Sequence, residues 1–387
     1  MSDRALPHVY LDHNATTPLH PEVLEAMTRV LREVYGNPSS SHALGAAARA
    51  ELERARSQVA ELVGFEDDEI VFTASATEAN NTALGSACLC PGAPPGELVT
   101  STIEHPSIAE PAARLAALGG KLTRVPVDPD GRIDPAAVAA ALSSETRLLS
   151  ILWANNETGV VQDVGSIAAD AGARGVPVHL DATQALGKIP VDGRVVNATL
   201  LTGSAHKFNG PKGVGFLAVR AGFPVTPWIQ GGPQERRRRG GTENVAGAVG
   251  MGVAAALAHR DLEGRARRYA MLRDRLWEGL RARVPQVRSN TPFERALPNT
   301  LSVEFCGVAG DILVEALDLE GVCVSSGAAC ASGSIEPSPV LSALGRTPDE
   351  ARATVRFSVG LGVDTAQIDR VLEIVPPLVA RVRGMTP

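Results

Sequence analysis

Lysine is scarce in this chain: only four of its 37 basic side chains are lysines, and the other 33 are arginines. Arginine therefore supplies the surface positive charge, and a lysine among Ser, His, Asn and Gly, such as Lys207, indicates a need for an amine rather than for charge alone. An amine that loses its proton can form an imine with a carbonyl cofactor, which a guanidinium cannot do. A solvated lysine on a turn is the ordinary alternative.

Paired cysteines and long apolar runs are also missing. The five cysteines are an odd number without CxxC spacing, and the N-terminus is polar, so we expect reduced thiols in a cytoplasmic enzyme. No apolar run approaches the roughly 18 residues that a membrane span needs. The formal net charge of −6 argues against nucleic acid as the main partner. We therefore expect the four arginines at 236–239 to be solvated or to lie in a dimer interface.

Short apolar segments alternate with helical patterns along most of the chain. Strands are expected at 70–73, 98–100, 123–127, 148–153, 178–180 and 200–201, and helices near 77–87, 107–118, 134–142 and 164–173. This alternation predicts a mostly parallel sheet covered by helices. The length of 387 residues suggests more than one domain. We expect a large domain over 15–260 and a smaller α+β domain formed by 1–14 and 261–387, with a long helix from 244 to 283 between them.

Polar side chains follow several of these strands, and ligands of such sheets gather beyond the carboxyl ends of the strands. Asp181 ends an apolar strand, where an unpaired carboxylate is very costly. A protonated pyridine nitrogen is a suitable partner and would make the ring an electron sink; a helix N-cap is the alternative. Gln184 is placed to hydrogen-bond a ring hydroxyl, unless it is a surface amide.

Further candidates lie at the ends of other strands. The segment 73–80 joins a strand to a helix, and the N–H groups of a helix N-terminus with a threonine hydroxyl suit a phosphate; Glu78 after Ser or Thr also fits a capping box. His105 is placed to stack on a planar ring or is an ordinary turn residue. The amides of Asn155 and Asn156 are candidates for contact with a ring oxygen or a substrate carboxylate.

The last quarter of the chain holds an arginine and a thiol with unusual surroundings. Arg356 stands in the middle of an apolar strand, where it either pairs with an acid of the protein or grips the carboxylate of a free amino acid through its planar fork. Cys330 lies in a stretch of the smallest side chains, which packs poorly and suits a reactive thiol. Cys306 and Cys323 lie within apolar strands, and we expect both in the core.

Together these segments resemble the pyridoxal-phosphate-dependent cysteine desulfurases of the nitrogen-fixation and iron–sulfur-assembly type, which are fold-type I enzymes of the class-V aminotransferase family. The resembling motifs follow the family's order over almost the whole chain: YLDHNATT at 10–17, TIEHP at 102–106, NNETG at 155–159, DATQ at 181–184, SAHK at 204–207, QER at 234–236, GTEN at 241–244, CASGS at 330–334 and RFS at 356–358. The resemblance implies an α/β fold with a mostly parallel seven-stranded sheet in the large domain and a smaller α+β domain carrying the Cys330 loop.

The resemblance also implies a role for each motif. Lys207 carries pyridoxal 5'-phosphate, Asp181 pairs with its pyridine nitrogen, and the catalytic His105 stacks on its ring. The ring oxygen contacts Gln184 and Asn156. The phosphate is bound by Ala76, Thr77, Ser204 and His206, together with Thr242 from the other subunit of a homodimer. Arg356 and Asn156 hold the carboxylate of the substrate, L-cysteine. Cys330 attacks the substrate sulfur, which leaves L-alanine and a persulfide that is passed to an iron–sulfur scaffold protein or another acceptor.

Three positions depart from the family pattern. Ala74 and Ser75 stand where the family usually has Ser and Gly, so Ser75 is expected to adopt a turn that glycine would take easily. Ala328 replaces the usual serine before the thiol. It stays open whether Cys330 ever ligates a transient iron–sulfur cluster.

Two rival functions remain at this point. Another fold-type I enzyme, an aminotransferase or a selenocysteine lyase, would need Lys207 but no reactive thiol. A non-enzymatic sulfur carrier would keep the fold only as a docking surface.

Overall fold

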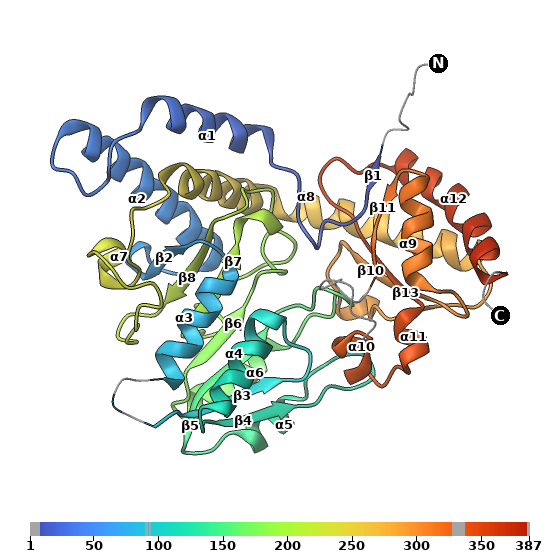
Figure 1. Ribbon diagram of the computed structural model, residues 1–387, viewed down its shortest axis with the longest axis horizontal. Coiled ribbons are helices and arrows are strands. Elements are labelled where there is room, and N and C mark those ends of the chain that lie inside the picture. The colour runs from blue at the N-terminus through green and yellow to red at the C-terminus, as the bar shows by residue number, and fades with distance from the viewer. Residues whose placement is uncertain (1–7, 90–91, 93, 327–336, 385–387) are drawn as a thin grey trace.

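A seven-stranded sheet forms the centre of the larger part of the molecule, seen on the left of Figure 1. Its strands are β2 (Ile70–Thr73), β3 (Glu97–Ser101), β4 (Lys121–Val125), β5 (Thr146–Leu152), β6 (Val178–Asp181), β7 (Leu200–Ser204) and β8 (Gly215–Val219), in the spatial order β2-β8-β7-β6-β5-β3-β4. β8 runs antiparallel to both of its neighbours, β2 and β7, and a short connection joins it to β7. The computed structural model describes residues 8–89, 92, 94–326 and 337–384.

Helices cover both faces of this sheet. They are α1 (Pro21–Glu33), α2 (Ala43–Val63), α3 (Ala76–Cys88), α4 (Pro106–Ala117), α5 (Pro135–Ala141), α6 (Val164–Ala173) and the first half of α8 (Val245–Arg283). Successive strand residues point to opposite faces: Leu200 packs in the cluster formed with α3 and α4, while Leu201 packs in the cluster formed with α2, α6 and α8. Burial of both faces explains why the strands are apolar runs rather than alternating patterns.

A second core lies on the right of Figure 1. It is built on the antiparallel sheet β12 (Ser325–Ser326), β13 (Thr354–Ser358), β10 (Thr300–Phe305) and β9 (Val287–Ser289), together with the parallel pair β1 (Val9–Tyr10) and β11 (Val322–Cys323). Its helices are α9 (Gly310–Leu319), α10 (Pro339–Ala343), α11 (Pro348–Arg352) and α12 (Thr365–Arg383). The short helical segments elsewhere are η1 (Asp67–Glu69), η2 (Ala205–Lys207), α7 (Gln234–Arg237) and η3 (Phe293–Arg295).

Helix α8 takes part in both cores. Its first half contributes Val249 and Ala255 to the core of the larger sheet, and its second half contributes Leu272 and Leu276 to the second core. The boundary expected at 260 falls inside this helix, and the division into two domains stays a prediction. None of the helices in the described part of the chain combines the length and the apolar character that a membrane crossing requires.

The structure confirms the expected fold class and the expected strands of the large sheet within a few residues. The prediction that Cys306 and Cys323 are core residues was wrong, since both are only partly buried. Cys306 comes directly after the end of β10. In β11 the inward position is taken by Val322, which is fully buried, so the neighbouring Cys323 is directed to the other face.

Candidate active site

A cavity of about 480 Å³ opens at the carboxyl ends of the large sheet's strands, a volume typical of small-molecule sites. It brings together ten of the residues that the sequence predicts: Ala76, Thr77, His105, Asn156, Asp181, Gln184, Ser204, His206, Lys207 and Arg356. A more open hollow of about 940 Å³ beside α8 contains none of them. The predicted site residues therefore converge on one place.

Lys207 ends the single helical turn η2, which joins β7 to β8 and holds its amine against the N-terminal segment. Its Nζ donates to the carbonyl oxygens of Asn14 at 2.6 Å and Ala15 at 2.9 Å. Burial lowers the pKa of Lys207 to about 8, with Arg356 acting in the same direction and Asp12 and Asp181 opposing it. The amine is thus close to losing its proton at neutral pH, as an imine-forming lysine must.

Asp181 is the last residue of β6 and is held by a buried network. Its Oδ2 accepts from Asn80 Nδ2 at 2.9 Å, and its Oδ1 accepts from the backbone N–H of Thr183 at 3.0 Å. Asn80 is itself fixed by Thr202, whose hydroxyl donates to the Asn80 amide oxygen at 2.6 Å. The carboxylate has no cationic partner among these contacts, which leaves it available to a protonated ring nitrogen.

His105 is the N-cap of α4, and this role fixes its ring. Its Nδ1 accepts from the backbone N–H of Ser107 at 3.1 Å and lies 2.8 Å from the Ser107 hydroxyl. Burial lowers the pKa of His105. The negative charge of Asp181 raises this pKa, and the positive charge of Lys207 lowers it. A neutral imidazole held in one orientation is suited to lie flat against an aromatic ring, although turn capping alone would also explain its contacts.

The N-terminus of α3 forms one end of the cavity. Ser75 is its N-cap, and the serine oxygen accepts from the N–H of Glu78 at 3.2 Å. The expectation that Ser75 needs a glycine-like turn was wrong, because its φ of −169° is extended backbone that any residue adopts. The glycine that matters is Gly215, where a Cβ would lie 2.5 Å from the carbonyl carbon of Ser75. Because Gly215 has no Cβ, β8 can approach the start of α3.

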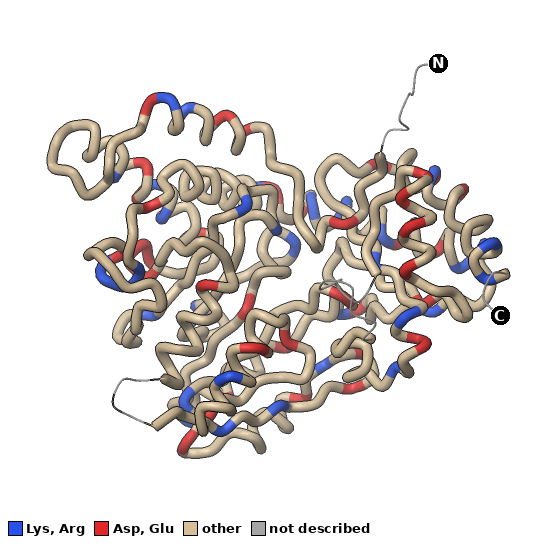
Figure 2. Tube along the Cα trace, viewed as in Figure 1, with Lys and Arg blue, Asp and Glu red and all other residues tan. Residues whose placement is uncertain are grey.

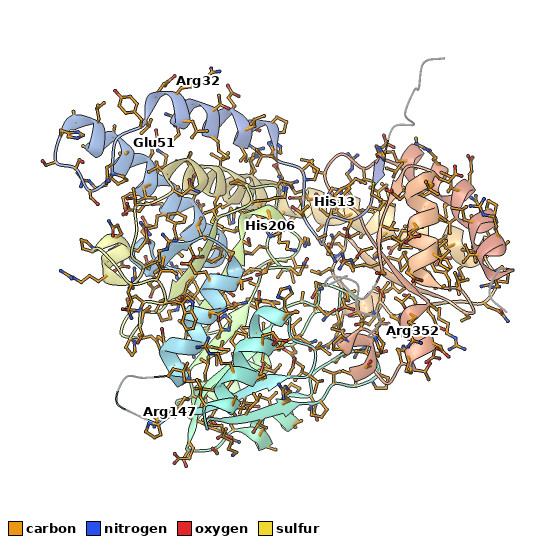
Figure 3. All side chains as sticks on the ribbon, viewed as in Figure 1. His13, Arg32, Glu51, Arg147, His206 and Arg352 are labelled. Atoms are coloured by element: carbon orange, nitrogen blue, oxygen red, sulfur yellow. The ribbon has the colours of Figure 1, made fainter. Side chains whose placement is uncertain are left out.

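Two further donors face the same end. Ser204 ends β7, and His206 lies between the two groups of elements in Figure 3. Burial and the nearby positive charges of Lys207, Lys212 and Lys188 together lower the pKa of His206 to about 4. A helix N-terminus, a hydroxyl and a neutral imidazole suit a phosphate, and their role as its seat stays a prediction.

Arg356 reaches the cavity from β13 of the second sheet. Its Nη2 pairs with Asp12 Oδ1 at 2.7 Å, its Nη1 donates to the carbonyl of Asn156 at 3.0 Å, and its buried Nε has no partner among the described residues. The first alternative left open by the sequence therefore applies, because the guanidinium pairs with an acid of the protein. Its grip on a substrate carboxylate stays a prediction, for which Nε is the remaining donor.

Asn155 does not belong to the cavity, and its expected ligand contact was wrong. Its amide nitrogen donates to the carbonyl of Ile103, and its oxygen accepts from the N–H groups of Glu157 and Thr158. All of its polar atoms are thus used to shape the loop after β5. This loop presents the neighbouring Asn156 to the cavity.

Thr242 and Cys330 are the two predicted residues that the described chain does not bring to the cavity. Thr242 is exposed and lies in the loop that follows the four arginines at 236–239. These arginines appear as a blue group in Figure 2. Two of those arginines donate to the carbonyl of Asp68, and Arg239 pairs with Glu78 at 3.0 Å, so the run is only partly solvated. Cys330 lies outside the described residues, but Ser325, five positions before it, lines the cavity.

The donor set fits pyridoxal phosphate. It supplies an amine with a lowered pKa, a carboxylate with no cationic partner, an anion seat and an imidazole that is free to stack. Two buried polar atoms of lining residues also lack a partner within the described chain: Thr183 Oγ1 and Arg356 Nε. Unpaired buried polar atoms are costly and indicate that a ligand supplies their partners.

Comparison with known proteins agrees with this geometry. Residues 9–371 match the aminotransferase class-V family. The chain belongs to that family. It is 47% identical over 385 residues to a cysteine desulfurase of Cereibacter sphaeroides, covering 99% of this chain and 98% of the relative. It is 40% identical over 379 residues to the cysteine desulfurase IscS of Dictyoglomus turgidum, covering 98% and 96%.

Solved structures also resemble this class-V aminotransferase. A NifS-like protein superposes with a TM-score of 0.91 at 35% identity, covering 97% of this chain and 100% of the other. SspA in complex with cysteine gives a TM-score of 0.82 at 32% identity, covering 91% and 98%. Class-V aminotransferases of the desulfurase type use pyridoxal phosphate, which is the group that the cavity fits.

Several residues that hydrogen-bond to the predicted site residues escaped the reasoning from sequence. Asn80 lies one helical turn after Thr77 on the same face of α3, a spacing that could have suggested it. Asn14 lies within the YLDHNATT motif but acts through its backbone carbonyl, which its side chain does not reveal. Lys188 carries no signal beyond its position four residues after Gln184.

Proposed function

We propose that this class-V aminotransferase is a cysteine desulfurase in which Lys207 and Cys330 divide the chemistry. The observation that carries the proposal is that one cavity joins Lys207, on the large sheet, to Arg356, on the small sheet, beside the strand that leads to Cys330. Ser325 pairs with Arg356 across β12 and β13. Ser326 ends β12 four residues before Cys330, a separation that an extended chain spans in roughly 14 Å.

The remaining roles follow from the chemistry of L-cysteine. The free donor of Arg356 binds the substrate carboxylate, and Lys207 moves a proton at the substrate Cα. The bound pyridoxal phosphate supplies an electron sink, with Asp181 at its ring nitrogen. The Cys330 thiolate attacks the substrate sulfur, so an S–S bond forms as the C–S bond breaks. The electron pair of that bond stays on carbon, which takes up a proton to give L-alanine, and the persulfide remains on Cys330.

A second copy of the chain completes the phosphate seat in this proposal. Thr242 is exposed and lies outside the cavity lining within one chain, which supports its donation to a partner subunit. Replacing Thr242 with valine should weaken pyridoxal phosphate binding. Mixed dimers that carry Lys207→Arg in one copy and Thr242→Val in the other should place both lesions in one site and leave the second site intact.

Sulfur transfer beyond the enzyme belongs to the same proposal. The persulfide would be passed to an iron–sulfur scaffold or another thiol acceptor in the cytoplasm. The two rival functions make different predictions. An aminotransferase would form no persulfide, and a docking protein would not bind the cofactor covalently.

The decisive experiment is mass spectrometry of the holoenzyme after exposure to L-cysteine. We expect one additional sulfur on the peptide that contains Cys330 and none in the Cys330→Ser variant. The visible absorption of the bound cofactor should be lost with borohydride in both proteins and should be missing in Lys207→Arg. Sulfur release by Cys330→Ser at the parent rate would instead indicate a lyase that needs no thiol.

A further inference from the structure

Lys188 is a buried lysine that the proposed chemistry does not use. It follows Gly187, whose φ of 70° suits glycine, on the turn after β6, and its side chain is only 3% exposed. Its Nζ donates to the backbone carbonyl of Gln184 at 3.0 Å and to the Gln184 amide oxygen at 2.7 Å. Lysine is rarely buried without an ion pair, and Lys188 has no acidic partner among the described residues.

The surroundings of Lys188 favour the uncharged amine. Burial holds the pKa of Lys188 well below the usual lysine value, and Lys207 and Arg356 lower it further. An uncharged amine has two N–H groups, and Gln184 accepts both hydrogen bonds. In both hydrogen bonds Lys188 is the donor, so Gln184 presents only acceptor oxygens to it.

The bond to Lys188 decides which end of the Gln184 amide faces the cavity. The two ends of an amide have nearly the same shape, so only their partners fix the orientation. With its oxygen on Lys188, the amide directs its nitrogen towards the carbonyl of Asn14, to which it donates at 3.0 Å. The same carbonyl oxygen accepts from Lys207 Nζ at 2.6 Å.

From this arrangement we propose that Lys188 is a positioning residue that fixes the Gln184 amide so that its second N–H, the one not donated to Asn14, faces the cofactor ring oxygen. The inference rests on the proposed function, in which Gln184 contacts that oxygen. An oxygen that carries negative charge needs a donor, and an inverted amide would present its own oxygen and repel it. Lys188 acts on the ring only through Gln184 and touches neither cofactor nor substrate.

A double-mutant cycle on cofactor affinity tests this role. The variants are Lys188→Met, Gln184→Ala and the double variant, each titrated as apoprotein with pyridoxal phosphate. We expect Lys188→Met alone to weaken binding by about 5- to 30-fold, the range that one buried hydrogen bond commonly supplies. In the Gln184→Ala background the same replacement should change affinity less than about twofold, because the residue through which it acts is gone.

The visible absorption provides a second measurement that a purely structural role would not move. Lys188→Met and Gln184→Ala should shift the absorption maximum of the bound cofactor in the same direction. The control is Lys121→Met on the edge strand β4, whose exposed side chain pairs with Glu97; it should leave both affinity and spectrum unchanged.

Equal effects of Lys188→Met in the two backgrounds would overturn the proposal. If Lys188→Met does not fold, Lys188→Gln, which keeps a shorter donor, replaces it in both backgrounds, and the same coupling decides. Failure of the parent protein to bind pyridoxal phosphate at Lys207 would instead contradict the proposed function, so the two failures can be told apart.

Discussion

The amine and the two imidazoles that face the cavity share one electrostatic property: burial lowers the pKa of all three. This holds for Lys207, His105 and His206. Removal from water disfavours the charged form, and the nearby cations Lys207 and Arg356 add to the effect. Near neutral pH the two imidazoles are therefore uncharged and can accept hydrogen bonds, and the Lys207 amine loses its proton more readily than an ordinary lysine.

The lowered pKa of Lys207 makes covalent capture of the cofactor pH-dependent. Only the uncharged amine reacts, so the rate at which apoprotein captures pyridoxal phosphate should rise about tenfold per pH unit below the midpoint. It should level off above about pH 8. Stopped-flow absorbance between pH 6 and pH 10 measures this, with Lys207→Arg as the unreactive control. A midpoint near the ordinary lysine value would show that burial does not perturb the amine.

At the scale of elements, the loop around α7 combines unusual backbone angles with a buried ion pair. Glu235, Arg236 and Arg237 all have positive φ values, from 46° to 66°, a conformation that costs non-glycine residues energy. The buried Glu235 accepts from both terminal nitrogens of Arg56 in α2, at 2.8 Å and 3.0 Å, and from the N–H of Phe72. This pair anchors the loop that leads to Thr242.

Replacing Arg56 with methionine should therefore destabilise the protein by about 3–5 kcal/mol, because Glu235 would remain as an unpaired buried charge. The double variant Arg56→Met/Glu235→Gln should recover much of that loss. Arg54→Met is the matched control, since Arg54 lies on the same helix in an exposed pair with Glu51 and should change stability by less than about 1 kcal/mol. Urea unfolding of all variants gives the comparison. A double variant no more stable than Arg56→Met would contradict the buried-charge account.

At the scale of the whole molecule, the site is shared by two cores. The large sheet supplies Lys207, Asp181 and His105, while the small sheet supplies Arg356. The N-terminal segment connects them: Asn14 and Ala15 accept from Lys207, and Asp12 pairs with Arg356. Asp12 thereby acts on both Lys207 and Arg356.

Asp12→Asn tests this connection. The amide keeps an acceptor for Arg356 but loses the charge that competes with a substrate carboxylate, so KM for L-cysteine should fall by about 2- to 10-fold. Because Asp12 raises the pKa of Lys207, its neutralisation should also move the midpoint for cofactor capture to lower pH. Asp12→Ala removes the acceptor as well and should raise KM through loss of orientation. An Asn variant with KM raised as far as in the Ala variant would show that the charge is immaterial.

The sequence by itself determined the order of elements and the chemistry of the main site residues. Apolar runs followed by Asp181, Gln184 and His105 are local signals, since each depends on a strand and the few residues after it. The tertiary structure decided the contacts that set their properties. The hydrogen bond between Asn80 and Asp181 joins residues 101 positions apart in the sequence. The bond from Lys207 to the Asn14 carbonyl joins residues 193 positions apart, and the Asp12–Arg356 pair joins residues 344 positions apart. Such contacts depend on how strands and cores pack, and burial, which fixes the pKa of Lys207 and the role of Lys188, exists only once that packing is complete.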